Sequence, residues 1–184
     1  LRSVQYISAT HELPNATYGS GGIYGAMSID ISSMVNTQAL GGKPVGLAVY
    51  RAHLSFSSDA DGSPVSVGET GAFRVMVTAK DIGTTGDNIG STGADSLSNN
   101  SALNIAGFDY YGPGATVTGD SGSGGWFLYA SDEVPYVVVR DTIYIIWNTQ
   151  AGLAGDLFLS VRLEVAPIKV TTNLMNQLIR TQSQ

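Results

Sequence analysis

The chain has 184 residues, of which 43% are hydrophobic, so the sequence predicts one well-buried domain spanning residues 1–184. Its net charge is −6, and the nine Lys and Arg residues are scattered singly; direct nucleic-acid binding is therefore not expected, because phosphate backbones require clustered cations. The absence of cysteine excludes disulfides, thiolate metal sites and cysteine nucleophiles.

The first half of the chain contains four segments in which apolar and polar residues alternate, as in strands of a half-buried sheet. Strands are expected at residues 4–10, 27–32, 48–56 and 73–78, with loops at 14–25, 36–44 and 57–71. In the third strand the alternation predicts one face with Ala48, Tyr50, Ala52, Leu54 and Phe56, and an opposite face with Val49, Arg51, His53 and Ser55.

The middle of the chain is dominated by two long polar segments. Residues 81–100 are rich in Gly, Thr, Ser, Asp and Asn, and residues 112–125 form a second Gly-rich loop. Strands are expected at residues 102–110 and 126–130, on either side of that second loop. Segments this long without regular structure are uncommon in a compact domain and are usually exposed or functional.

Residues 134–170 form the region around which the rest of the domain is expected to be organised. The segment 157–166 alternates strictly, with Leu159, Val161 and Leu163 among the residues on its apolar face. The preceding run carries Ile145 on one face and Ile146 on the other, which predicts a strand covered on both sides. Because the connection at residues 148–155 contains two glycines, the two strands are predicted to form a long central hairpin.

The period changes to helical after residue 170. Leu174 and Leu178, and Met175 and Ile179, are spaced four apart, and residues 171–173 offer N-caps. A short helical tail over residues 170–184 is expected, ending in a frayed segment from Arg180 onward.

About eight strands, long loops and one terminal helix predict an all-β fold, a single eight-stranded jelly-roll sandwich or barrel with a short C-terminal helix. An immunoglobulin-like sandwich is the competing architecture, but the chain lacks its Cys…Trp…Cys signature.

One short motif points to catalysis. Gly119-Asp-Ser121-Gly122 resembles the nucleophile signature of chymotrypsin-like serine proteases, and His53, Asp81 and Ser121 occur in that family's order. The gaps between these three residues are too short for two six-stranded barrels, so no catalytic residue is assigned and no enzyme is expected. Neither histidine has a second ligand at zinc spacing, so no metal and no cofactor is predicted.

Two groups of residues are candidates for contact with other molecules. The first is an apolar outer face that would mediate assembly, with Arg162 on the neighbouring strand. Its predicted members are Val137, Val139, Tyr144, Ile146 and Arg162. The second is a ligand or partner loop flanked by Tyr110, Tyr111 and Trp126, whose rings offer a stacking platform.

Over residues 4–170 the chain resembles a single jelly-roll viral capsid protein, most closely in Asp141-Thr-Ile-Tyr-Ile-Ile-Trp and Asp156-Leu-Phe-Leu-Ser-Val-Arg-Leu-Glu-Val. Without a basic arm, it looks most like the small upright-barrel major capsid proteins of membrane-containing icosahedral double-stranded DNA viruses of archaea and thermophilic bacteria. That resemblance implies a location in the virion shell and assembly with copies of itself and a second capsid protein. It also implies an internal membrane between the shell and the genome. The alternatives are a secreted or virion-surface glycan-binding module and, third, a serine hydrolase.

Overall fold

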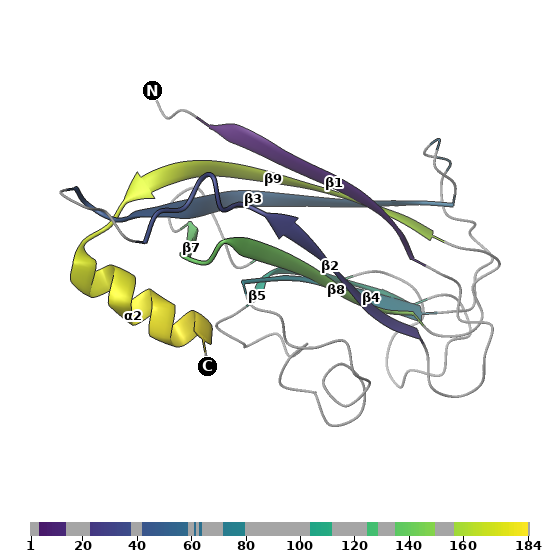
Figure 1. Cartoon of the computed structure of the whole chain (residues 1–184). Coiled ribbons are helices and arrows are strands. Elements are labelled where there is room, and N and C mark those ends of the chain that lie inside the picture. The colour runs from purple at the N-terminus through teal and green to yellow at the C-terminus, as the bar shows by residue number, and fades with distance from the viewer. Residues whose placement is uncertain are drawn as a thin grey trace.

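The computed structural model describes residues 4–13, 23–37, 42–58, 61, 63, 72–79, 104–111, 125–128, 135–149 and 157–183. Within these ranges, nine strands form two antiparallel sheets that lie one above the other, and one helix packs at one end of the sandwich (Figure 1). The loops expected at residues 57–71, 81–100 and 112–125 lie almost entirely outside the described residues.

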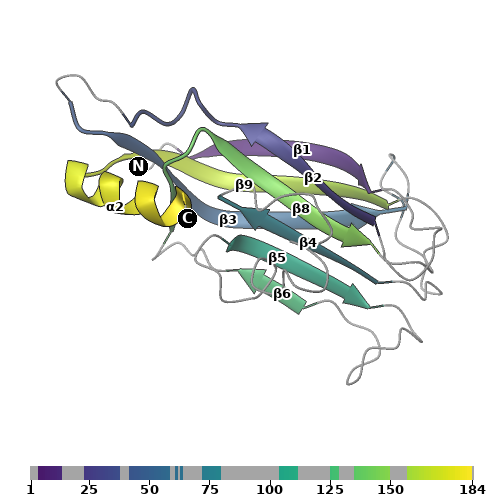
Figure 2. The same cartoon turned by 60° about the horizontal axis from the view of Figure 1, so that its bottom comes forward.

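The two sheets have simple strand orders. The first contains, from edge to edge, β1 (Gln5–Leu13), β9 (Leu157–Lys169), β3 (Val45–Ser57) and β7 (Tyr136–Val138). Figure 2 shows the second sheet, with β2 (Ile23–Asp30), β8 (Thr142–Thr149), β4 (Ala72–Thr78), β5 (Asn104–Tyr111) and β6 (Gly125–Leu128) side by side.

The strand pairings identify the architecture as a jelly roll. β1 pairs with β9, β2 with β8, β3 with β7 and β4 with β5, all antiparallel. The first half of the chain thus pairs with the second half in reverse order and forms one long antiparallel ribbon. This ribbon is rolled up so that its strands form two facing sheets. Eight strands form this ribbon, and β6 lies beside β5 at the edge of the second sheet. β6 is the strand expected at residues 126–130, whereas the run expected as a single strand before residue 148 is divided into β7 and β8.

The predicted central hairpin is wrong. β8 and β9 are consecutive in the chain but lie in opposite sheets, and each pairs with strands from elsewhere in the sequence. The apolar alternation does not distinguish the two arrangements, because the apolar face of each strand is buried whether the strands pair in one sheet or lie in facing sheets. In facing sheets, the buried sides of both strands contribute to one core, where Ile145 and Leu163 are each 0% exposed.

The space between the sheets is filled with aliphatic side chains and one tryptophan. Members of this core that are at most 5% exposed include Leu47, Val49, Leu54, Val75, Val77, Ile143, Ile145, Trp147, Leu159, Leu163 and Val165. Burying each aliphatic side chain of this size contributes about 1.5–3 kcal/mol. The sandwich interior is therefore a packed core in the described part of the chain.

β3 departs from the predicted alternation because it contains a bulge. Its pairing with β9 shifts register between Val49 and Arg51, which leaves Tyr50 as the extra residue. Val49 lies in the main core, whereas Ala48 and Tyr50 pack in a separate cluster with Ala166. Two-fold alternation reverses at a bulge, so Ala48 and Tyr50 do not share a face with Ala52, Leu54 and Phe56.

The C-terminal helix α2 (Thr172–Ser183) confirms the change of period. Its N-terminus is capped as expected, since the Leu174 backbone N–H donates to Oγ1 of Thr171 at 3.3 Å. The expected fraying from Arg180 is wrong, because the helix continues to Ser183 and Gln182 is only 2% exposed. Among the described residues, no helix is long and apolar enough to cross a membrane.

Candidate functional site

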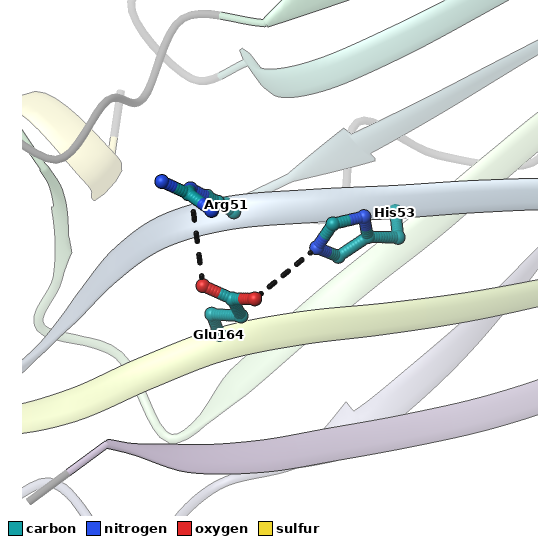
Figure 3. Close-up of polar contacts among 3 residues, drawn as sticks. All are labelled: Arg51, His53 and Glu164. Atoms are coloured by element: carbon teal, nitrogen blue, oxygen red, sulfur yellow. Dashed lines mark hydrogen bonds and ion pairs between the residues drawn. The ribbon is translucent and has the colours of Figure 1, made fainter.

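The outer face of the first sheet carries the charged side chains that the β3 bulge brings into register with β9. Arg51 lies opposite Glu164, and His53 lies opposite Arg162. Glu164 sits between two partners: its Oε2 is 3.9 Å from Nε of Arg51, and its Oε1 is 3.3 Å from Nε2 of His53 (Figure 3). The alternation in the sequence predicts that Arg51 and His53 share one face of their strand, but it gives no sign that Glu164 joins them.

The Arg51–His53–Glu164 cluster is accessible to solvent. The side chains of Arg51 and His53 are 51% and 56% exposed, and that of Glu164 is 20% exposed. Exposed ion pairs contribute only about 0–1 kcal/mol to folding, so the cluster has little value as a stabilising device. Its chemistry suits polar contact with another surface.

Arg162 lies next to this cluster, on the outer face where the alternation of β9 predicted it. Its guanidinium carbon is 4.1 Å from the centroid of the Tyr6 ring, on the neighbouring strand β1. Tyr6 is 54% exposed, and a cation over an exposed ring gains about 0.5–1 kcal/mol. The stacking holds the Arg162 charge over β1, near the edge of the sheet.

Val137 and Val139, two of the predicted assembly residues, belong to β7 and the residue after it. Both pack against α2, in a cluster that contains Val170 and Met175. Val139 is 2% exposed. The second covering that the apolar pattern requires is supplied here by the chain's own C-terminal helix.

Tyr144 and Ile146 lie on the outer face of the other sheet. Ile146 is 0% exposed and packs with Met76, which is 1% exposed. This burial confirms that β8 is covered on both faces. The structure therefore does not bring the five predicted assembly residues onto one surface: two contact α2, two lie on the second sheet, and Arg162 lies on the first sheet.

The aromatic residues proposed to flank a ligand loop are on neighbouring strands. Trp126 pairs with Phe108 across β5 and β6, and Tyr110 and Tyr111 end β5 opposite Phe73 and Ala72 of β4. The loop between β5 and β6 lies outside the described residues, as do Asp81 and Ser121 of the considered triad. His53, the third member of that triad, faces Glu164.

In the part of the chain that the structure describes, no three His, Asp or Glu side chains gather in a way that could hold a metal ion. One buried polar atom there lacks a hydrogen-bond partner, the indole Nε1 of Trp147. The ring of this tryptophan contacts His11 with a centroid separation of 4.5 Å.

Comparison with known proteins identified structures but no sequence relatives. No protein-family model and no curated protein matches the sequence. One similar solved structure is the VP1 pentamer of human polyomavirus 7, at 12% identity and a TM-score of 0.43, with 91% of this chain and 96% of that chain covered. Another is from Desmodium yellow mottle tymovirus, at 11% identity and a TM-score of 0.28, with 92% and 91% covered. The jelly-roll assignment follows from the strand pairings of the chain itself.

Proposed function

We propose that the chain is a structural capsid protein that assembles with copies of itself into the icosahedral shell of a virion. The observation that carries this proposal is a jelly roll whose described interior is filled with aliphatic side chains. Jelly rolls occur in capsids, lectins and cupins. Because aliphatic side chains fill the described interior, we expect the protein to act through its outer surfaces. Assembly into a shell takes place through such surfaces.

The low content of charged residues favours contact between the surfaces of different copies. Only 13% of residues are charged, about half the usual share. A surface with few charged groups loses little charge hydration when it is buried against another copy. On the outer face of the first sheet, Glu164 forms an ion pair with Arg51.

The proposal extends to the organisation of the particle. We propose a second capsid protein and an internal membrane beneath the shell, as in the membrane-containing double-stranded DNA viruses of archaea and thermophilic bacteria. The scattered cations and the net charge of −6 support a shell that does not itself bind the genome, because genome binding requires clustered positive charge.

Native mass spectrometry and negative-stain microscopy of the purified chain test the assembly. The expected result is closed particles or discrete oligomers, formed by the chain alone or with a second protein from the same particle. A chain that stays monomeric at high concentration, both alone and with the other proteins of its source particle, overturns the proposal.

A glycan-binding module is the second candidate, favoured by the pairing that places Tyr110 and Trp126 on adjacent strands. It predicts a monomer that binds sugars and loses this binding in Trp126→Ala. Phe127→Ala on the same strand is the matched control. Sugar binding by a monomeric chain would favour this candidate over the capsid.

We further propose that the chain has no hydrolase activity. It should not react with a fluorophosphonate probe, and Ser121→Ala should leave its measurable properties unchanged. Probe labelling that disappears in Ser121→Ala would restore the hydrolase hypothesis.

A further inference from the structure

The two edges of the first sheet differ in how they are protected. At one edge, β7 is three residues long, and the Gln182 side chain bonds the backbone of Val137 and Val139. At the other edge, β1 has nine residues and, among the described strands, pairs only with β9 (Figures 1 and 2). Edge strands usually avoid pairing through short length, Pro, charged side chains (above all Lys) or bulges. β1 contains no Pro, Gly or Lys, and Glu12 is its single Asp, Glu, Lys or Arg residue.

We propose that β1 pairs antiparallel with β1 of a second copy about a two-fold axis at Ala9, which joins two four-stranded sheets into one continuous sheet. The inference rests on the proposed function, because it names one contact through which copies of a shell protein meet. Backbone hydrogen bonds between edge strands are a general way for chains to associate. A two-fold contact is self-complementary, so every pairing occurs twice, except that of Ala9 with its own copy on the axis.

The length of β1 determines the register. Full overlap of two strands that each span Gln5–Leu13 centres the axis on Ala9. Tyr6 then lies opposite Glu12 of the second copy, and Ser8 lies opposite Thr10. A shift of one residue would set the outer face of one strand against the inner face of the other. Thr10, whose hydroxyl lies 3.4 Å from that of Ser160, and Tyr6, which contacts Arg162, both lie on the outer face.

Charge complementarity supports this register. Arg162 is held over the Tyr6 ring, and the register sets Glu12 of the second copy directly opposite Tyr6, so its carboxylate lies beside Arg162. Within one chain the two charges do not meet. Arg162 pairs with Ser8, and Glu12 pairs with Phe158; the four-residue offset along the strand corresponds to about 13 Å. Glu12 and Arg162 are both exposed in the single chain.

A charge swap tests the contact in solution. Glu12→Arg and Arg162→Glu should each weaken self-association of the purified chain by about tenfold in analytical ultracentrifugation, and the double variant should restore it. Arg180→Glu, an equal charge change at an exposed site on α2, is the matched control and should have no effect. Single variants that associate like the wild type, or a double variant that is no better than the singles, overturn the register.

Cross-linking tests the same contact without altering charge. The chain has no cysteine, so single cysteines can be introduced at chosen positions. In the proposed register, residues 8 and 10 of different copies are directly opposed, at about 4.5–5.5 Å between Cα atoms, which is within disulfide range. Oxidising a mixture of Ser8→Cys and Thr10→Cys chains should give a linked dimer that contains one of each. Either variant alone should link much less, because like residues are then diagonal, about 7–8 Å apart.

Ser160→Cys, on the strand β9 that pairs with β1 within one chain, is the control. It measures how often cysteines of different chains are linked by random collision. Mixed dimers no more abundant than this background overturn the inference. The outcome is separate from that of the proposed function. If particles form without the mixed cross-link, the proposed capsid function stands and the β1 contact is wrong. If cross-linked dimers form but never assemble further, the β1 contact stands and the capsid function is wrong.

Discussion

The Gln182 side chain completes the hydrogen bonding of the sheet edge at Val139. Its Oε1 accepts from the Val139 backbone N–H at 3.1 Å, and its Nε2 donates to the Val137 carbonyl at 2.7 Å. One amide side chain from the last turn of α2 thus takes the place that a further strand would occupy. It also fixes the helix against β7, whose outer face the helix covers.

Gln182→Glu tests this bridge with almost no change in shape. A carboxylate can still accept from Val139, but it cannot donate to the carbonyl of Val137, and it places charge in a site that is 2% exposed. We expect the free energy of unfolding to fall by about 1–3 kcal/mol. Urea denaturation at neutral pH measures it. Gln177→Glu, the same change at an exposed position of α2, should cost less than 0.5 kcal/mol, roughly as surface substitutions do. Equal effects of the two changes would contradict the bridge.

The alternation of β9 predicts a large difference between neighbouring residues. Leu163 is 0% exposed, so Leu163→Ala should cost about 2–5 kcal/mol through lost burial and a cavity. Arg162→Ala removes only an exposed contact with Tyr6, worth about 0.5–1 kcal/mol. Thermal and urea unfolding of the isolated chain measure both. Similar small losses would show that this face of β9 is not buried as the structure has it.

The sequence predicts those features of the fold that depend on residues close together in the chain. The alternation of β9 and the four-residue spacing of α2 are set by neighbouring residues, and both predictions are confirmed. The bulge at Tyr50 could not be predicted, because it depends on the register of β3 against a strand more than a hundred residues away. The same limit applies to β8 and β9, since the intervening segment is compatible with a hairpin or with a crossing between sheets.

The candidate site was predicted less well than the fold, for a related reason. Val137 and Val139 were expected on an outer face that contacts another molecule, whereas the chain's own helix packs against both. The apolar pattern cannot say whether a neighbour or the chain itself covers such a face. Gln182 was placed in a frayed tail because a glutamine near a terminus gives no signal of burial. The contact of Tyr6 with Arg162 joins the first strand to the last, and no local pattern reports it.

Gly25 and Trp147 give a prediction that depends on their direct pairing across β2 and β8. A Cβ on residue 25 would clash with the edge of the Trp147 ring, so Gly25→Ala should cost about 1–3 kcal/mol through overpacking. In a Trp147→Leu background the ring is gone, and the same change should cost much less. A double-mutant cycle from urea denaturation measures this coupling. Ser28→Ala, at an exposed position of β2, is the control. Additive costs would show that the ring does not require the glycine.

Tyr136 predicts a fall in stability at alkaline pH. It packs against the main core from β7, and burial raises the pKa of its hydroxyl from 10.0 to about 12. Below pH 10 the phenol is neutral in both states, so its shifted pKa adds no pH dependence. Between about pH 10 and 12 the unfolded chain releases this proton while the folded chain retains it, so the free energy of unfolding falls as the pH rises.

The size of this alkaline loss is limited by the partial exposure of the ring. Two pKa units correspond to about 2.7 kcal/mol, and solvent screening of a partly exposed group reduces the expected loss to about 1 kcal/mol. Urea denaturation measures the free energy of unfolding at pH 9 and at pH 11. The fall between these two pH values should be smaller by this amount in Tyr136→Phe than in the wild type. Tyr6→Phe removes the same hydroxyl from a residue that is 54% exposed and should retain the wild-type drop. If Tyr136→Phe loses as much stability as the wild type between these pH values, the hydroxyl of Tyr136 is not desolvated in the folded chain.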